Sequence, residues 1–131
     1  MTPARTGGLV AGMGDAKTYT GGCHCAKVRY RATTDLRGAM ECNCSICSKR
    51  AHLLTFVAPE QFELLTDESE LTDYQFNTHN IHHLFCSTCG IGSWGHGTGP
   101  DGKKMISVNV RCLDDVDLGS LEITQYDGKS R

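Results

Sequence analysis

The stretch Glu41–Arg50 reads E-C-N-C-S-I-C-S-K-R and holds the densest group of cysteines in the chain. Its cysteines, Cys42, Cys44 and Cys47, form a C-x-C-x-x-C motif. Three thiols this close can face one point only if the backbone turns tightly around it, and a zinc ion is the usual occupant of such a point. Because zinc takes four ligands, the motif leaves one position open.

The whole chain has 131 residues and a formal net charge of −2. This length predicts one domain, and the small charge gives no reason to expect binding to nucleic acid or to a membrane. Hydrophobic residues make up 39% of the sequence, which implies a modest core that metal sites would help to stabilise. No apolar run approaches the ~20 residues of a transmembrane helix.

Eight cysteines in a chain of this length fit either a disulfide-bonded secreted domain or a metal-binding protein. The tight C-x-C and C-x-x-C groups favour metal binding. Glycines interrupt the apolar residues near Leu9, so this region lacks the continuous apolar run of a signal peptide. We therefore expect a cytoplasmic protein whose thiols are held by metal.

The distribution of apolar residues predicts a mainly β fold, made of several small antiparallel sheets around two zinc sites. Residues 1–16 are rich in glycine and lack a period, so we expect a flexible tail followed by one domain over residues 17–131. Lys27–Ala32 and Ile106–Val110 alternate between polar and apolar side chains, as strands with one buried face do. We expect further strands at 36–41, 53–57, 62–65, 71–76, 81–85 and 91–96, and a last strand that begins at 121 and ends at 127–128. The strand at 36–41 should pair with 27–32. We also expect a turn at 21–25 and one helical turn at 45–50.

Seven of the eight cysteines fall into three groups, and seven divides into a closed site of four ligands and an open site of three. The simplest grouping places the C-x-C pair, Cys23 and Cys25, on one ion with the C-x-x-C pair, Cys86 and Cys89. That grouping joins the first strand to the C-terminal half of the chain. The three-cysteine motif would then hold the second ion.

Other pairings remain open. A histidine could complete the three-cysteine motif and make it purely structural, with His52, His83 and His96 as candidates. His24 lies between two predicted ligands on an extended segment, so its side chain should point away from the metal. Cys112 stands alone, and we interpret it as a small buried apolar residue.

Three segments together resemble the signatures of the glutathione-dependent formaldehyde-activating enzymes. They read G-G-C-H-C-A-K-V-R at residues 21–29, C-N-C-S-I-C at residues 42–47 and F-C-S-T-C-G at residues 85–90. The resemblance extends from about Tyr19 to Tyr126. Three cysteine groups in matching order make a specific signal, whereas any one of them alone would be weak.

One branch of this family, which includes centromere protein V, is especially similar at Phe76–Gly90 and Cys112–Asp114. A non-catalytic, zinc-stapled binding module of that kind is therefore the alternative function. The family often has glycine after the second cysteine of its first motif, where this chain has Ala26.

The resemblance implies several small sheets and two zinc ions per chain, a structural zinc on the four-cysteine set and a catalytic zinc on the three-cysteine motif. It implies a carbon–sulfur lyase that joins a thiol such as glutathione to an aldehyde, giving S-(hydroxymethyl)glutathione or a related adduct. Three cysteinates on a zinc ion leave one negative charge, which nearby cations should offset. Lys49 and Arg50 are candidates, although they could equally form a solvated pair on a turn.

Overall fold

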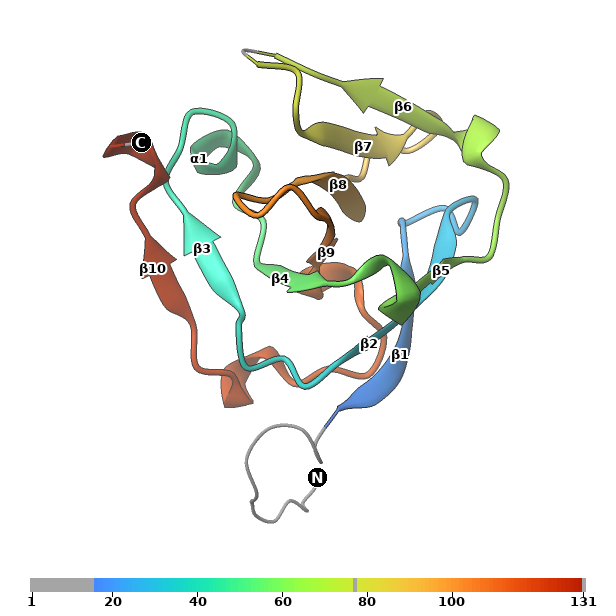
Figure 1. Cartoon of the computed structure of the whole chain (residues 1–131). Coiled ribbons are helices and arrows are strands. Elements are labelled where there is room, and N and C mark those ends of the chain that lie inside the picture. Colours follow the sequence, from blue (N-terminus) through green and yellow to red (C-terminus); the bar gives the residue numbers. More distant parts are fainter. Residues whose placement is uncertain (1–15, 77, 131) are drawn as a thin grey trace.

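The computed structural model describes residues 16–76 and 78–130, whose strands form two sheets (Figure 1). The prediction of a mainly β fold is confirmed, whereas the flexible tail expected at residues 1–16 lies, except for Ala16, outside the described residues. The smaller sheet has the strand order β1-β2-β5, and the larger has the order β10-β3-β4-β9-β8-β7-β6. The strands are β1 Lys17–Gly22, β2 Arg29–Thr34, β3 Met40–Cys42, β4 Leu54–Val57, β5 Phe62–Leu64, β6 Leu71–Tyr74, β7 His82–Cys86, β8 Trp94–Thr98, β9 Lys104–Asn109 and β10 Thr124–Tyr126.

Short helical turns connect these strands. The α-helix α1 spans Cys47–Arg50, close to the helical turn expected from the sequence. None of the helices in the described part of the chain is long and apolar enough to cross a membrane. Single 3₁₀ turns occupy η3 Pro59–Gln61, η4 Glu68–Glu70, η5 Val110–Cys112, η6 Leu118–Ser120 and η7 Gly128–Ser130.

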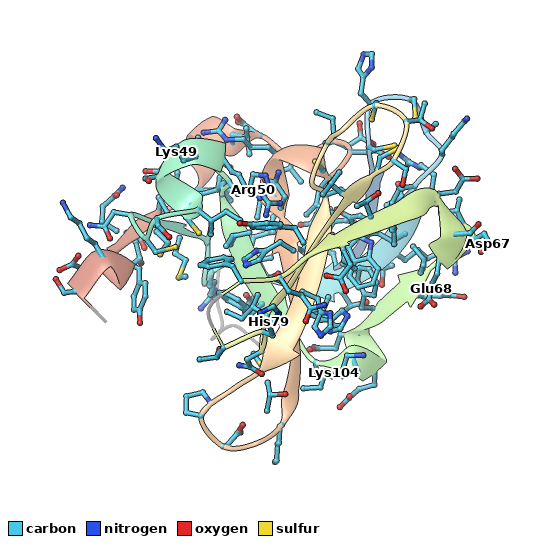
Figure 2. All side chains as sticks on the ribbon, turned by 90° about the horizontal axis from the view of Figure 1, so that it is seen from above. Lys49, Arg50, Asp67, Glu68, His79 and Lys104 are labelled. Atoms are coloured by element: carbon cyan, nitrogen blue, oxygen red, sulfur yellow. The ribbon has the colours of Figure 1, made fainter. Side chains whose placement is uncertain are left out.

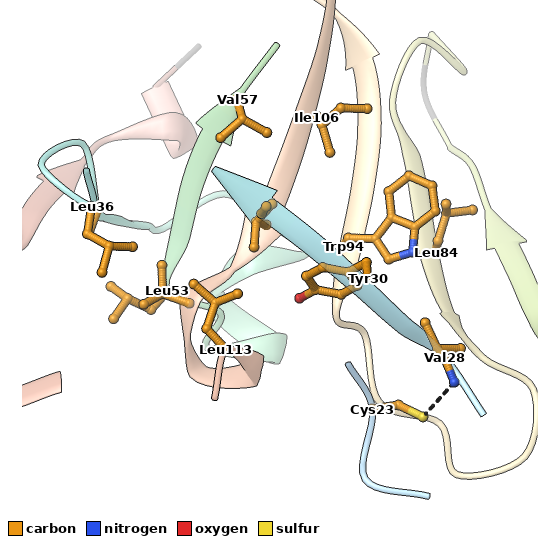
Figure 3. Packing of buried hydrophobic residues seen from close by; sticks show 14 of the residues in the cluster. Cys23, Val28, Tyr30, Leu36, Leu53, Val57, Leu84, Trp94, Ile106 and Leu113 are labelled. Carbon is orange, nitrogen blue, oxygen red and sulfur yellow. Dashed lines mark hydrogen bonds between the residues drawn. The ribbon is translucent and has the colours of Figure 1, made fainter. Parts of the chain in front are cut away.

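The core lies where the two sheets pack against each other. Val28, Tyr30 and Ala32 are fully buried, which confirms the alternation seen in the sequence around β2. Phe62 stacks between Tyr30 and Trp94, with ring centroids 5.1 Å and 4.6 Å away, and so joins the smaller sheet to the larger. Figure 3 shows Tyr30 and Trp94 among the buried side chains of this cluster.

The predicted pairing of residues 36–41 with 27–32 is wrong. β2 pairs with β1 and β5, and β3 lies in the other sheet, antiparallel to β4 and parallel to β10. The chain changes direction at a turn where Leu36 has a φ of 63°. The backbone N–H groups of Leu36 and Arg37 are bonded to the side chains of Thr34 and Asp35, which holds the turn and sends the chain into the larger sheet.

Two smaller expectations also differ from the structure. Gly21 and Gly22 were expected in a turn, but they end β1, and only the residues after them turn. The strand expected at 91–96 begins later, at Trp94, because the carbonyl of Ile91 accepts a hydrogen bond from the N–H of Cys86 and extends the preceding turn. The strands expected at 62–65 and 71–76 are present as β5 and β6, and they lie in different sheets, which the sequence did not specify.

Candidate metal centres

The first cysteine cluster joins two ends of the fold. Cys23 and Cys25 follow β1, Cys86 ends β7, and Cys89 lies in the turn after it. The four sulfur atoms lie within 4.8 Å of one another, with 3.7 Å between Cys23 and Cys25 and 3.6 Å between Cys25 and Cys86. Zn–S bonds of about 2.3 Å in a tetrahedron place sulfurs about 3.8 Å apart, so the cluster has the size of a closed zinc site.

Backbone N–H groups approach these sulfurs and lower the pKa of Cys86 and Cys89, whereas at Cys25 the effect of the Lys27 N–H is outweighed by burial and the neighbouring thiols, which raise the pKa to about 11. Val28 N–H points at the sulfur of Cys23 from 3.4 Å (Figure 3), and Cys89 N–H points at the sulfur of Cys86 from 3.5 Å. The backbone N–H of Ile91 lowers the pKa of the Cys89 thiol to about 6, against the opposing effect of burial. A thiolate is the form that ligates metal, so the donor set suits zinc.

The second cluster is made by one loop. Cys42 ends β3, Cys44 lies in the turn that follows, and Cys47 begins α1, so the three sulfurs also lie within 4.8 Å of one another. All three residues are partly exposed. Burial alone would raise the pKa of the Cys44 thiol, but hydrogen bonds from the backbone N–H of Cys47 and from neighbouring thiols lower it. The structure thus divides the seven cysteines into four and three.

The described residues provide no fourth ligand atom for the second cluster. His52 and His83 line the cavity beside it without joining it, and His96 stacks on His82 with a centroid distance of 4.3 Å. The histidine-completed site considered from the sequence is therefore not formed here. The open position expected for the three-cysteine motif stays a prediction.

The C-terminal segment holds the three-cysteine loop in place, a contact that the sequence did not reveal. Asn43 sits between two of the cysteines and bonds the Asp127 carboxylate at 3.0 Å and the Lys129 N–H at 2.8 Å. Gly128 packs so closely that a Cβ there would lie 2.5 Å from the sulfur of Cys42. Figure 1 shows the C-terminal end of the chain beside β3 and the α1 loop. The Asp-Gly pair looked like an ordinary strand end in the sequence, although its glycine is required by this close approach.

Lys49 and Arg50 have different environments. Lys49 is exposed, whereas Arg50 is half-buried and, in Figure 2, lies further toward the interior than Lys49. The Arg50 Nε donates to His52 Nε2 at 3.2 Å, and its guanidinium covers Gly92, where any side chain would overlap it. Burial lowers the pKa of Arg50, while the Cys47 thiolate acts to raise it. Of the two cations, Arg50 is therefore the one that faces the three-cysteine cluster.

Two cavities meet at Arg50. We call the larger, of about 830 Å³, the arginine groove, because Arg29, Arg50 and Arg111 line it. We call the smaller, of about 330 Å³, the apolar cavity; it borders all three sulfurs of the second cluster. The two cavities share the wall formed by Ile46, Arg50, His52, His83 and Asn109, and only the apolar cavity is lined by the three cysteines of the second cluster.

The two remaining sequence expectations concern the arginine groove. His24 is exposed on its wall and is not part of the four-cysteine cluster, as expected. Cys112 is half-buried in the same wall and also stays outside both clusters. Burial, with the nearby Cys23 and Cys89 thiolates, raises the pKa of Cys112 to about 11, so this thiol stays protonated at neutral pH.

Comparison with known proteins agrees with this geometry. A crystal structure of a protein from Rhodobacter sphaeroides is 28% identical in sequence, covers 81% of this chain and 98% of its own, and superposes with a TM-score of 0.70. The sequence matches the family described as glutathione-dependent formaldehyde-activating enzyme over residues 18–126. That match includes both cysteine clusters and most of both cavities, and the chain therefore belongs to the glutathione-dependent formaldehyde-activating enzyme family.

Proposed function

We propose that this protein is a zinc-dependent carbon–sulfur lyase that forms or cleaves S-(hydroxymethyl)glutathione or a related thiol adduct. The observation that carries the proposal is a three-cysteine cluster without a fourth ligand that lines the apolar cavity, next to a groove with two guanidinium groups that have no ion-pair partner among the described residues. Family membership supports the reaction type. We propose two zinc ions per chain, a structural one on Cys23, Cys25, Cys86 and Cys89 and a catalytic one on Cys42, Cys44 and Cys47.

The zinc on the three-cysteine cluster would keep a substrate thiol ionised at neutral pH, where a free thiol with a pKa of ~8.5 is mostly protonated. In the forward reaction the sulfur lone pair forms a C–S bond to the aldehyde carbon, and the C=O π pair moves to oxygen, which takes up a proton. Cleavage is the reverse, with the C–S bond pair leaving on sulfur. No electrons are gained or lost overall.

The arginine groove supplies the charges that a carboxylate-bearing thiol needs. Arg29 is paired with Asp114, but neither Arg50 nor Arg111 has an ion-pair partner among the described residues. Glutathione has two carboxylates, and guanidinium groups bind carboxylates in a fixed two-pronged geometry. Arg50 lies nearer the cluster and Arg111 further along the groove, which gives the tripeptide a direction with its thiol toward Cys47.

The histidines in the wall shared by the two cavities are neutral, weakly basic rings that can accept hydrogen bonds. Burial and the Arg50 charge lower the pKa of His52 to about 4, and the same two causes lower the pKa of His83. Both rings are therefore neutral at pH 7, and His52 uses Nε2 to accept from Arg50. In the proposed reaction an imidazole nitrogen of His83 exchanges the proton of the adduct hydroxyl.

The test combines elemental analysis with exchange NMR on ¹³C-formaldehyde and glutathione. We expect two zinc ions per chain and a rate of interconversion between free and adduct formaldehyde that rises linearly with protein concentration. Replacing glutathione by 2-mercaptoethanol should remove most of the acceleration, because that thiol has no carboxylate. Two bound zinc ions without acceleration would instead favour the non-catalytic binding module.

A further inference from the structure

The apolar cavity is larger than formaldehyde requires. Its volume is about 330 Å³, whereas formaldehyde has two heavy atoms and fills roughly the space of two water molecules, about 60 Å³. The cavity begins at the sulfurs of the three-cysteine cluster, so a group bonded to the reacting carbon would extend into it. Most of the space next to the reacting atoms would be left unused by the one-carbon aldehyde.

The walls of this cavity are suited to hydrocarbon. One of its polar side chains is fully engaged, because Asn109 Nδ2 donates to the Gly92 carbonyl at 3.1 Å and Asn109 Oδ1 accepts from the Arg111 N–H at 3.2 Å, whereas the buried Nε1 of Trp94 has no hydrogen-bond partner among the described residues. His52 is bonded to Arg50. Of the three arginines that line the arginine groove, only Arg50 also lines this cavity, so the charges that match the two carboxylates of glutathione lie mainly in the groove. The apolar lining comes from Met40, Leu54, Phe56, Phe76, Ile81 and Trp94.

The rim of the cavity is also apolar and exposed. Phe56 is 41% exposed and Ile81 is 50% exposed, although both are large hydrophobic side chains. Scattered exposed apolar residues need no explanation, but these two flank one cavity that ends at a reactive thiol cluster. This arrangement fits a small molecule with an apolar group better than a flat protein partner.

We infer that the carbonyl substrate carries an apolar alkyl or aromatic substituent, which occupies the apolar cavity while the thiol carrier lies in the arginine groove. The inference rests on the proposed function and defines its substrate class. The product is a hemithioacetal, formed when the thiolate sulfur bonds the aldehyde carbon and the former carbonyl oxygen takes one proton.

The first experiment compares hexanal with acetaldehyde, which have similar carbonyl reactivity, as partners of glutathione in exchange NMR. Each methylene group that is buried in the cavity should raise kcat/KM about fourfold, which is equivalent to ~0.8 kcal/mol. Hexanal has four more methylene groups, and part of the chain stays in water, so we expect kcat/KM to be at least tenfold higher for hexanal. Equal values for the two aldehydes would overturn the inference.

Three single substitutions test whether the preference for hexanal over acetaldehyde arises in the apolar cavity. Phe56→Ala and Ile81→Ala should reduce the hexanal-to-acetaldehyde ratio severalfold, because each removes rim contacts. Ile123→Ala should leave the ratio unchanged, since Ile123 is similarly exposed, at 38%, and lines neither cavity. Using a ratio within one protein cancels any loss of folded enzyme. A ratio that falls equally in all three variants would contradict the assignment.

A binding measurement separates this inference from the proposed function. Trp94 is the only tryptophan in the chain and lines the apolar cavity, so its fluorescence reports occupancy. We expect benzyl mercaptan to change this fluorescence with at least tenfold higher affinity than 2-mercaptoethanol. Preference for benzyl mercaptan without turnover of any glutathione adduct would contradict the proposed lyase reaction but not the apolar character of the cavity. Turnover of the formaldehyde adduct, with no preference for hexanal or for benzyl mercaptan, would contradict the inference and leave the proposed function intact.

Discussion

The two cysteine clusters differ in where their members come from and in what surrounds them. The four-cysteine cluster joins Cys25 to Cys86, 61 residues away, and Cys86 is only 1% exposed. The three-cysteine cluster lies within one loop, is partly exposed throughout and lines the apolar cavity. A closed set of ligands that crosslinks distant segments contributes to folding, whereas an open set on a local loop is free to bind a substrate.

The largest expected effect separates these two roles directly. Cys86→Ser should leave three thiolates where four distant ligands were joined, and structural zinc binding contributes on the order of 10 kcal/mol in small domains. Because typical domain stability is about 5–15 kcal/mol, we expect this variant to be unfolded or to melt far below the wild type. Cys44→Ser should lose one zinc ion and all turnover but retain a cooperative melt.

The measurements are zinc content, thermal unfolding by circular dichroism, and exchange NMR on both variants. Similar destabilisation by the two substitutions would mean that both clusters are structural. Wild-type turnover in Cys44→Ser would show that the reaction takes place elsewhere.

The next largest effect is expected for Arg50, which lies beside the three-cysteine cluster. Arg50→Ala removes a guanidinium without an ion-pair partner among the described residues, and hydrogen bonds to charged groups contribute ~1.5–3 kcal/mol. We expect kcat/KM for the glutathione adduct to fall by about 10- to 100-fold, mainly through KM. Lys49→Ala, which removes a neighbouring but exposed cation, should change it less than about twofold. Equal losses in both variants would indicate a general charge effect.

His52 gives a smaller effect that appears as pH dependence of stability. Its pKa is lowered from 6.5 to about 4 in the folded protein, first by burial and then by the Arg50 charge. Between these values the unfolded chain binds a proton that the folded chain does not, so stability falls as the pH is lowered through this window. For a partly buried ring we expect a loss of about 2 kcal/mol.

The comparison variant is His52→Gln, which can still accept the hydrogen bond from Arg50 but does not titrate. Urea unfolding at pH 4 and pH 6.5 should show a smaller loss of stability in this variant than in the wild type. Protonation of the cysteines affects both proteins and cancels in the difference. An identical pH slope in the two proteins would show that His52 is not held in its neutral form.

The division of the cysteines could be predicted from the sequence because ligand spacing within each group is a local property. The alternation around Tyr30 was equally local, and it located the buried face of β2 correctly. The pairing of residues 36–41 could not be predicted, since it depends on one residue, Leu36, adopting a positive φ. Apolar alternation in a short strand does not specify which neighbour that strand pairs with.

The parts of the candidate site that were missed depend on contacts between distant segments. Arg50 is selected over Lys49 because Gly92, far along the chain, leaves room for its guanidinium. Asn43 is held by residues of the C-terminal segment, and Phe56 reaches the apolar cavity from β4. In the sequence these residues look like an ordinary turn, a glycine and a strand, and only the tertiary fold gives them a shared position.

The smallest expected effect concerns the backbone of the four-cysteine cluster. The residue after the second cysteine of each pair has a positive φ, 70° at Ala26 and 81° at Gly90. This conformation destabilises a non-glycine residue by ~1–2 kcal/mol. Glycine avoids that strain, but its greater freedom in the unfolded chain offsets part of the gain in folding free energy. Ala26→Gly should therefore raise the free energy of unfolding by about 0.5–1 kcal/mol, and Gly90→Ala should lower it by a similar amount.

Urea unfolding of the two variants with zinc present tests this symmetry. A Cβ at Gly90 would meet no atom within 4 Å, so its cost comes from backbone strain alone and not from a clash. Turnover of the glutathione adduct should be unchanged in Ala26→Gly, because Ala26 lines neither cavity, whereas Gly90 lines the arginine groove and its variant is compared by stability alone. If Ala26→Gly destabilised the protein, the strain at this turn would be offset by contacts of the Ala26 methyl group. The two halves of the cluster would then not be equivalent, and the difference between the closed and open clusters would include side-chain packing as well as ligand number.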